Sequence, residues 1–119
     1  MATRHAEIAG GGIGGFALAA ALAQRGWTVQ LHEQAPELRE LVIGLGVWHN
    51  GQRACKALGV LDQLLPGAST LTRWEMIDET QEIVAANPSG LIVLLRTDLH
   101  RALIAAAQNA GVQIGRAHV

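Results

Sequence analysis

Residues 6–33 of this 119-residue chain read AEIAGGGIGGFALAAALAQRGWTVQLHE. A short apolar run opens the stretch and is followed at once by Gly10, Gly12 and Gly15, in the spacing G-x-G-x-x-G. The stretch closes on an acidic residue, Glu33. Glycines at this spacing are typical of a tight turn between a strand and a helix that pack closely together.

The segments around the glycines predict a strand, a helix and a second strand. Between Phe16 and Arg25, apolar residues recur at helical spacing, and small residues among them allow the helix to lie close to a sheet. Gly26 can end this helix, and residues 27–33 carry β-branched and aromatic residues that favour a strand. The order predicts an α/β fold with a Rossmann-like βαβ unit and a parallel sheet.

This arrangement suits the diphosphate and ribose of a dinucleotide. The first glycine permits the turn, the second lets the backbone approach a pyrophosphate, and the third allows helix–strand contact. Free N–H groups and the positive dipole end at the helix start face the phosphates, so no basic side chain is needed. Glu33 stands close to the roughly 20-residue interval at which a carboxylate binds a ribose. We interpret the stretch as a cofactor-binding unit rather than a structural glycine-rich turn. Taken alone, an acidic residue such as Glu33 at a strand end is usually a solvated charge.

Three blocks of sequence carry a resemblance to a known family. The pattern of residues 10–33, with Ala19, Leu22 and Val29 among its fixed positions, resembles the N-terminal signature of FAD-binding oxidoreductases, although NAD-binding proteins share much of it. Residues 34–65 (QAPELRE, GLGVWHNG and ALGVLD within them) and residues 95–103 (LRTDLHRAL) extend the likeness over nearly the whole chain. Together the blocks resemble the flavin-dependent aromatic hydroxylases, the group A flavoprotein monooxygenases.

The resemblance implies a set of FAD-binding residues. It assigns Glu33 to the adenosine ribose, Gly14 and its neighbours to the diphosphate, the Leu45 backbone to the flavin region, and Arg96 to the phosphate or ribityl portion. Arg96 also has merit of its own, because a guanidinium offers several donors to phosphate and keeps its charge; the alternative is a surface arginine beside a helix start. The candidate cofactor-binding residues are Gly10, Gly12, Ile13, Gly14, Gly15, Glu33, Gln34, Leu45 and Arg96.

The match has three departures. Relatives usually have glycine where this chain has Val42, and proline where it has His49. We interpret His49 as an exposed substitution rather than a catalytic group. Some relatives carry a catalytic histidine at the position of Gly46, and glycine cannot transfer a proton. No catalytic residue is therefore assigned.

The mechanism that the resemblance implies is hydroxylation of a small aromatic substrate. FAD accepts a hydride from NADH or NADPH, forms a C4a-hydroperoxide with oxygen and transfers one oxygen atom. Members of the family are much longer, and their Gly-Asp segment has no counterpart here, since no Gly-Asp pair occurs in the sequence. We therefore expect the N-terminal portion of a monooxygenase, either a natural truncation or an incomplete sequence, with weak or no activity alone.

Two other function classes stay open. The first is a small NAD(P)-binding dehydrogenase domain, in which Glu33 would hold the adenosine ribose of the nicotinamide cofactor. The second is a non-catalytic remnant that folds with a partner chain.

Composition excludes several roles. The formal net charge is −1, half the residues are apolar, and neither an 18-residue apolar run nor a signal peptide is present, which predicts a soluble cytoplasmic protein without membrane contact. The scattered basic residues disfavour nucleic acid, and the histidines lack metal-ligand spacing. Cys55, the single cysteine, excludes an internal disulfide and is expected to be a small buried helix residue.

The middle of the chain predicts short elements. We expect helices at 52–58 and 60–65, then a strand pair at 71–77 and 82–86. The resemblance makes this pair, at about residues 70–90, the start of the substrate-domain sheet. Trp74 and Met76 alternate to one face, which we assign to the core.

The last third completes the parallel sheet. Residues 91–95 predict a buried strand, Thr97 is expected to cap a helix over 98–109, and Gly111 to end it. Residues 112–115 then form a third parallel strand beside the one that ends at Glu33. The strand at 6–9 would keep an unpaired edge, so we expect poor solubility, association or partial folding.

Overall fold

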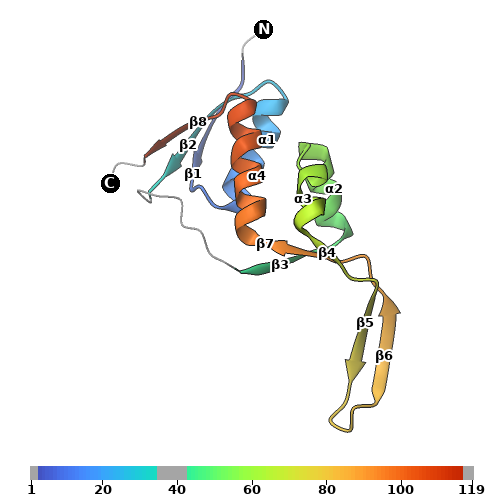
Figure 1. The fold of residues 1–119 in the computed structure, drawn as a ribbon. Coiled ribbons are helices and arrows are strands. Elements are labelled where there is room, and N and C mark those ends of the chain that lie inside the picture. Colours follow the sequence, from blue (N-terminus) through green and yellow to red (C-terminus); the bar gives the residue numbers. More distant parts are fainter. Residues whose placement is uncertain (1–2, 35–42, 117–119) are drawn as a thin grey trace.

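One part of the molecule is a three-stranded parallel sheet, shown in the ribbon of Figure 1. The computed structural model describes residues 3–34 and 43–116. The sheet has the strand order β1-β2-β8, with Ile8 opposite Leu31 and Leu31 opposite Ile114. Its strands are β1 (His5–Ala9), β2 (Thr28–Glu33) and β8 (Gln113–Arg116). The predicted third strand beside β2 is therefore confirmed.

Two long helices lie beside this sheet, and they pack on each other. Helix α1 (Ile13–Gln24) follows β1 and contacts β2, and α4 (Arg96–Asn109) runs alongside α1 (Figure 1). Gly26 and Gly111 follow these helices with φ of 89° and 96°, in the left-handed region that glycine adopts without cost. Both predicted helix ends are confirmed.

A second sheet has antiparallel pairing and the order β3-β7-β4. Two short helices connect β3 to β4, and the 3₁₀ turn after them contains Pro66. These elements are β3 (Gly44–Val47), α2 (His49–Leu58), α3 (Leu61–Leu64), η1 (Leu65–Gly67), β4 (Ser69–Thr70) and β7 (Ile92–Leu95). The predicted short helices are confirmed, although α2 begins at His49, three residues earlier than expected.

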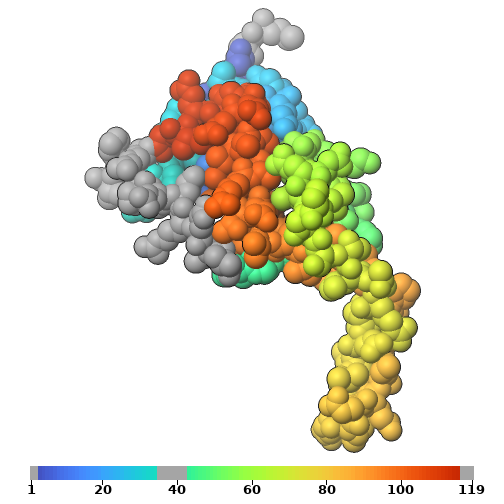
Figure 2. Space-filling view, viewed as in Figure 1, coloured from blue at the N-terminus to red at the C-terminus, as the bar shows by residue number. Residues whose placement is uncertain are grey.

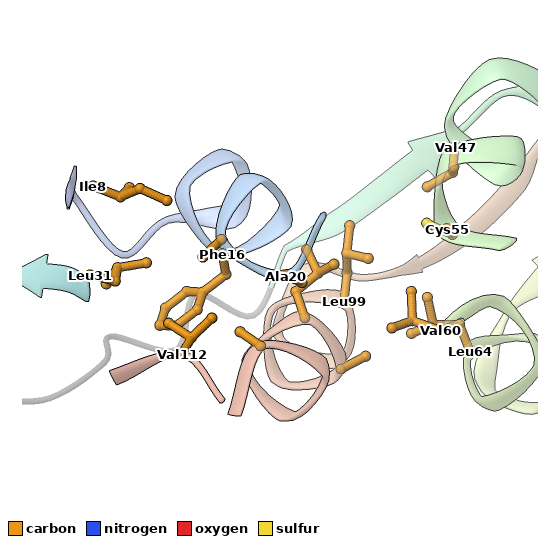
Figure 3. Packing of buried hydrophobic residues seen from close by; sticks show 14 of the residues in the cluster. Ile8, Phe16, Ala20, Leu31, Val47, Cys55, Val60, Leu64, Leu99 and Val112 are labelled. Atoms are coloured by element: carbon orange, nitrogen blue, oxygen red, sulfur yellow. The ribbon is translucent and has the colours of Figure 1, made fainter. Parts of the chain in front are cut away.

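The core runs through both parts of the fold. Figure 3 shows Phe16 of α1 lying beside Leu31 of β2 and Val112, and a second group at the other side where Cys55 of α2 faces the helix that carries Leu64. Phe16 and Leu31 are fully buried, and Cys55 is buried as predicted. The chain thus buries its apolar residues between the two helix pairs and the sheets.

A β-hairpin extends away from these layers (Figures 1 and 2). Its strands, β5 (Arg73–Ile77) and β6 (Ile83–Pro88), pair only with each other among the described residues. Trp74 and Met76 are 38% and 56% exposed, so their assignment to the core is wrong for the described chain. Their alternation in sequence puts them on one side of β5, but periodicity does not say whether anything covers that side.

The start of α4 also differs from expectation. Thr97 does not cap the helix: α4 begins at Arg96, its N-cap is Leu95 in extended conformation, and no side chain caps it. Thr97 lies inside the first turn and is buried. The Arg96 N–H donates to the Ile43 carbonyl at 2.8 Å, which satisfies one of the free donors at the helix start without a side-chain cap.

Candidate cofactor-binding site

The glycine loop connects the end of β1 to the start of α1. Gly10 has φ of 107°, a conformation that a residue with a side chain rarely adopts. Its N–H donates to the His32 carbonyl at 2.8 Å, so the loop starts against the end of β2. The first glycine therefore makes the turn, as its position in the sequence predicted.

The third glycine is required by packing. A Cβ at Gly15 would overlap the carbonyl oxygen of Gly10 and would also contact Ile8. Because the overlapping neighbour is backbone, it cannot move aside as the end of a side chain can. The helix therefore lies against the loop at a separation that only glycine allows.

Internal packing does not require a glycine at the second position, Gly12, or at Gly14. A Cβ at either residue would meet no described atom within 4 Å. Gly12 is the N-cap of α1, and no side chain caps the helix start, so the first-turn N–H groups have no partner within the helix. Open space and uncapped donors at a helix N-terminus are the features that accommodate an anionic group.

Glu33 lies next to the loop. Its Oε2 accepts a hydrogen bond from the Gly11 N–H at 2.5 Å, although 22 residues separate the two in sequence. Glu33 is the last residue of β2, and Gln34 follows it with an exposed side chain. The structure thus brings the predicted acidic residue to the glycine loop.

A residue that sequence reasoning missed also contacts the loop. His100 of α4 is 7% exposed, and its Nε2 lies 2.7 Å from the Gly11 carbonyl oxygen. Its ring packs edge-to-face against Phe16, with centroids 5.5 Å apart and an angle of 63°. Sequence reasoning assigned His100 no role; the pattern that could have found it is its position one turn after Arg96, within the same block.

Arg96 occupies the first turn of α4. Its side chain is half-buried, and no hydrogen bond or ion pair joins its guanidinium to another described residue. Because residues four apart lie on one face of a helix, Arg96 shares the face of His100, about 6 Å further toward the helix start. That face carries His100 to the glycine loop, which places Arg96 toward the same side of the molecule.

Leu45 lies in β3, opposite Leu94 of β7. Its side chain is half-buried and packs against the core. The hydrogen bond from Arg96 to Ile43 holds the start of α4 beside the residue that precedes β3. No described contact joins Leu45 to the glycine loop, so its place beside the flavin stays a prediction.

The departures from the family pattern lie around β3. His49 is exposed at the first position of α2, and its ring packs on Gly90, where a Cβ would overlap it. Gln52 donates to the carbonyls of Val47 and Gly90 at 2.9 and 2.8 Å, which joins α2 to the loop before β7. The contact with Gly90 gives His49 a packing role. Val42 lies outside the described residues.

Away from the glycine loop, the described part of the chain contains a groove of about 400 Å³ between α4 and the helices α2 and α3 (Figure 2). It is lined by Gln24 and Asn109 at the C-terminal ends of α1 and α4, with alanines between them. The glycine loop lies at the other end of α1. None of the described lining residues is charged, so the groove offers no acid, base or phosphate-binding side chain.

Residues 3–34 and 43–116 contain neither a candidate metal site nor a membrane-spanning helix. No group of three or more His, Cys, Asp or Glu side chains in these ranges could hold a metal ion. No helix within them is long and apolar enough to cross a bilayer.

Comparison with known proteins points to one group of enzymes. No protein-family model matches the chain. It is 39% identical over 120 residues to a 2-heptyl-3-hydroxy-4(1H)-quinolone synthase from Mycobacteroides abscessus, an alignment that covers 96% of this chain and 32% of the relative. It is 35% identical over 115 residues to a 3-hydroxybenzoate 6-hydroxylase from Polaromonas naphthalenivorans, covering 87% of this chain and 29% of that protein.

Solved structures show the same relationship. The tetrameric form of 2-methyl-3-hydroxypyridine-5-carboxylic acid oxygenase matches with a TM-score of 0.84 and 39% identity, over 96% of this chain and 31% of that one. Klebsiella pneumoniae HpxO, solved in complex with FAD and uric acid, matches with a TM-score of 0.75 and 25% identity, over 93% and 30%. The chain thus spans about a third of the length of the relatives it matches. By sequence and by fold, the chain is similar to the N-terminal portion of the FAD-dependent aromatic hydroxylases.

Proposed function

We propose that this chain binds FAD by its ADP half, with the diphosphate at the start of α1 and the adenosine ribose at Glu33. One observation carries the proposal: the uncapped N-terminus of α1 opens beside Gly12 and Gly14, two glycines that no described atom requires. An anion close to the backbone supplies the missing reason for both glycines. The N–H groups at Ile13, Gly14 and Gly15 would donate to it.

Glu33 can serve the ribose without releasing the loop. A carboxylate has two oxygens and about four acceptor positions. The Gly11 N–H takes one position on Oε2, and we infer that ribose hydroxyls donate to other positions of the carboxylate. Gln34, exposed directly after the strand, is placed to line the same end of the sheet.

Arg96 would hold a phosphate or the ribityl chain further along the cofactor. Its charge persists at every physiological pH, and its guanidinium is not engaged by another described residue. The Leu45 backbone would then border the flavin, beside the start of α4. Two contacts support these roles. The Arg96 N–H bonds to Ile43, just before β3, and His100 of α4 bonds to the glycine loop.

The activity of a complete protein that carries this unit is a wider proposal. Its relatives include a hydroxylase and an oxygenase of aromatic rings, and we infer hydroxylation of a small aromatic substrate with NADH or NADPH as the electron donor. Bound FAD would supply hydride acceptance and oxygen activation, while the described residues bind and orient it. The hairpin β5–β6 would begin the substrate-domain sheet, with its apolar face against later sequence.

The outer edge of β1 supports a further part of the proposal. Among the described strands β1 pairs only with β2, so its other edge presents free N–H and C=O groups. Such an edge promotes pairing with another chain. We infer that the 119-residue chain associates through this edge when nothing else covers it.

Ligand titration tests the proposal. Calorimetry with FAD, ADP and NADH should show binding of FAD and ADP, and preference for NADH with no affinity for FAD would refute it in favour of a dehydrogenase domain. Glu33→Gln keeps an acceptor oxygen but loses the charge, and should weaken ADP binding by roughly 1 kcal/mol, the difference between a hydrogen bond to a charged group and one to a neutral group. Glu79→Gln, the same change at an exposed hairpin position, should leave ADP affinity unaltered.

A further inference from the structure

We propose that His100 is a positioning residue for the cofactor diphosphate: it holds the Gly11 carbonyl so that the Gly12 N–H points to the phosphates. The proposal rests on the proposed dinucleotide site. It adds a residue from α4 that does not itself touch the ligand.

The contact fixes the protonation of the ring. A carbonyl oxygen can only accept a hydrogen bond, so a pairing at 2.7 Å requires a proton on Nε2 of His100. The imidazole is buried, and a buried polar group generally keeps its hydrogen-bond partner. Phe16 packs against the ring and restricts its rotation, which aims Nε2 at the loop.

Peptide geometry carries this contact to the phosphate side. In a planar trans peptide, the C=O and the following N–H point in opposite directions. The Gly11 carbonyl points into the protein toward His100, so the Gly12 N–H in the same peptide points away from α4. No described atom would meet a Cβ at Gly12, so that residue borders open space.

The neighbouring peptide is held from the other side. The Gly11 N–H donates to Glu33, while the Gly11 carbonyl accepts from His100. A glycine with both of its backbone groups engaged loses the conformational freedom that three consecutive glycines would otherwise have. The loop is thereby pre-organised for an anion, which removes part of the ordering cost of binding.

Two ligands separate this role from general stability. ADP needs the diphosphate site and adenosine does not, so His100→Leu should weaken ADP binding about tenfold, the effect of one ordinary hydrogen bond, and change adenosine binding little. His100→Gln, which keeps a side-chain N–H donor, should restore most of the ADP affinity. Leu103→Ala, at a residue on the same helix that is 2% exposed, should lower the melting temperature without changing the ADP-to-adenosine ratio.

The outcomes are distinct. Equal affinity of the unmodified chain for ADP and adenosine would refute the proposed function itself. A normal ADP-to-adenosine ratio in His100→Leu, or a loss of the same size in Leu103→Ala, would overturn the role of His100 alone. If His100→Leu does not fold, ¹⁵N NMR of the histidine ring in the unmodified chain decides, because a neutral ring with its proton on Nδ1 cannot donate from Nε2 to Gly11.

Discussion

Replacing Gly15 with alanine should destabilise the chain, whereas the same change at Gly14 should not. Both glycines lie in the first turn of α1 and differ in what a methyl group would meet. At Gly15 the new Cβ would overlap the Gly10 carbonyl oxygen, and at Gly14 it would meet nothing within 4 Å. The difference in stability between the two variants therefore measures how tightly α1 packs against the glycine loop.

The magnitude follows from two opposing effects. Alanine favours a helix over glycine by about 0.5–1 kcal/mol, and this gain applies to both variants. Overpacking against backbone costs about 1–3 kcal/mol, and this cost applies to Gly15→Ala alone. The two variants should therefore differ by about 1–3 kcal/mol, with Gly14→Ala at or slightly above the stability of the unmodified chain.

Urea denaturation followed by circular dichroism measures this difference. All variants should be compared at one protein concentration, because association shifts apparent stability by mass action. A difference of about 1–3 kcal/mol corresponds to melting temperatures roughly 4–12 °C apart for a chain of this size. Equal midpoints for Gly14→Ala and Gly15→Ala would show that α1 does not press on the Gly10 carbonyl, and the packing argument would fail.

Three further outcomes are expected. Burial raises the pKa of the Cys55 thiol above its ordinary value of 9.0, so the folded state holds this proton more tightly than the unfolded state. The free energy of unfolding should therefore fall as pH rises above about 9. Cys55→Ala should reduce that fall in urea titrations between about pH 8 and 10. Hydrogen bonds from the Thr80 hydroxyl at 2.6 Å and from the Glu82 and Thr80 N–H groups lower the pKa of Asp78 below 3.8, so the hairpin turn should persist above that pH and loosen as pH falls through the lowered value. Asp78→Ala should accordingly speed proteolysis at the turn at neutral pH, and an unchanged cleavage rate would contradict this role. Light scattering should show concentration-dependent association of the unmodified chain, and a monodisperse monomer with a sharp cooperative melt would argue against the exposed β1 edge.

Local patterns in the sequence were sufficient to predict most elements. Helical periodicity and the glycines at 26 and 111 predicted α1, α4 and their ends, because these features depend on a few neighbouring residues. The parallel order of the first sheet followed from the alternation of strands and helices. The start of α4 was wrong by two residues, since a backbone hydrogen bond from Arg96 to Ile43, not the Thr97 hydroxyl, satisfies the helix start.

Long-range contacts were harder to predict. The interval between Gly15 and Glu33 predicted an acidic residue at the loop, because a βαβ unit has a nearly fixed length. The contact from His100 to Gly11 spans 89 residues and depends on how α4 packs against α1, which no local pattern specifies. The exposure of Trp74 and Met76 depends on what lies against the hairpin, which periodicity does not reveal.

The sequence distance between Gly11 and His100 also affects the order of events during synthesis. The glycine loop, α1 and β2 leave the ribosome early, while His100 is made 89 residues after Gly11. At about 5–20 residues per second, roughly 5–20 seconds separate the two. During that interval the nascent loop lacks the contact from α4, so a nucleotide present in the cell would meet a less ordered site on the growing chain than on the finished one.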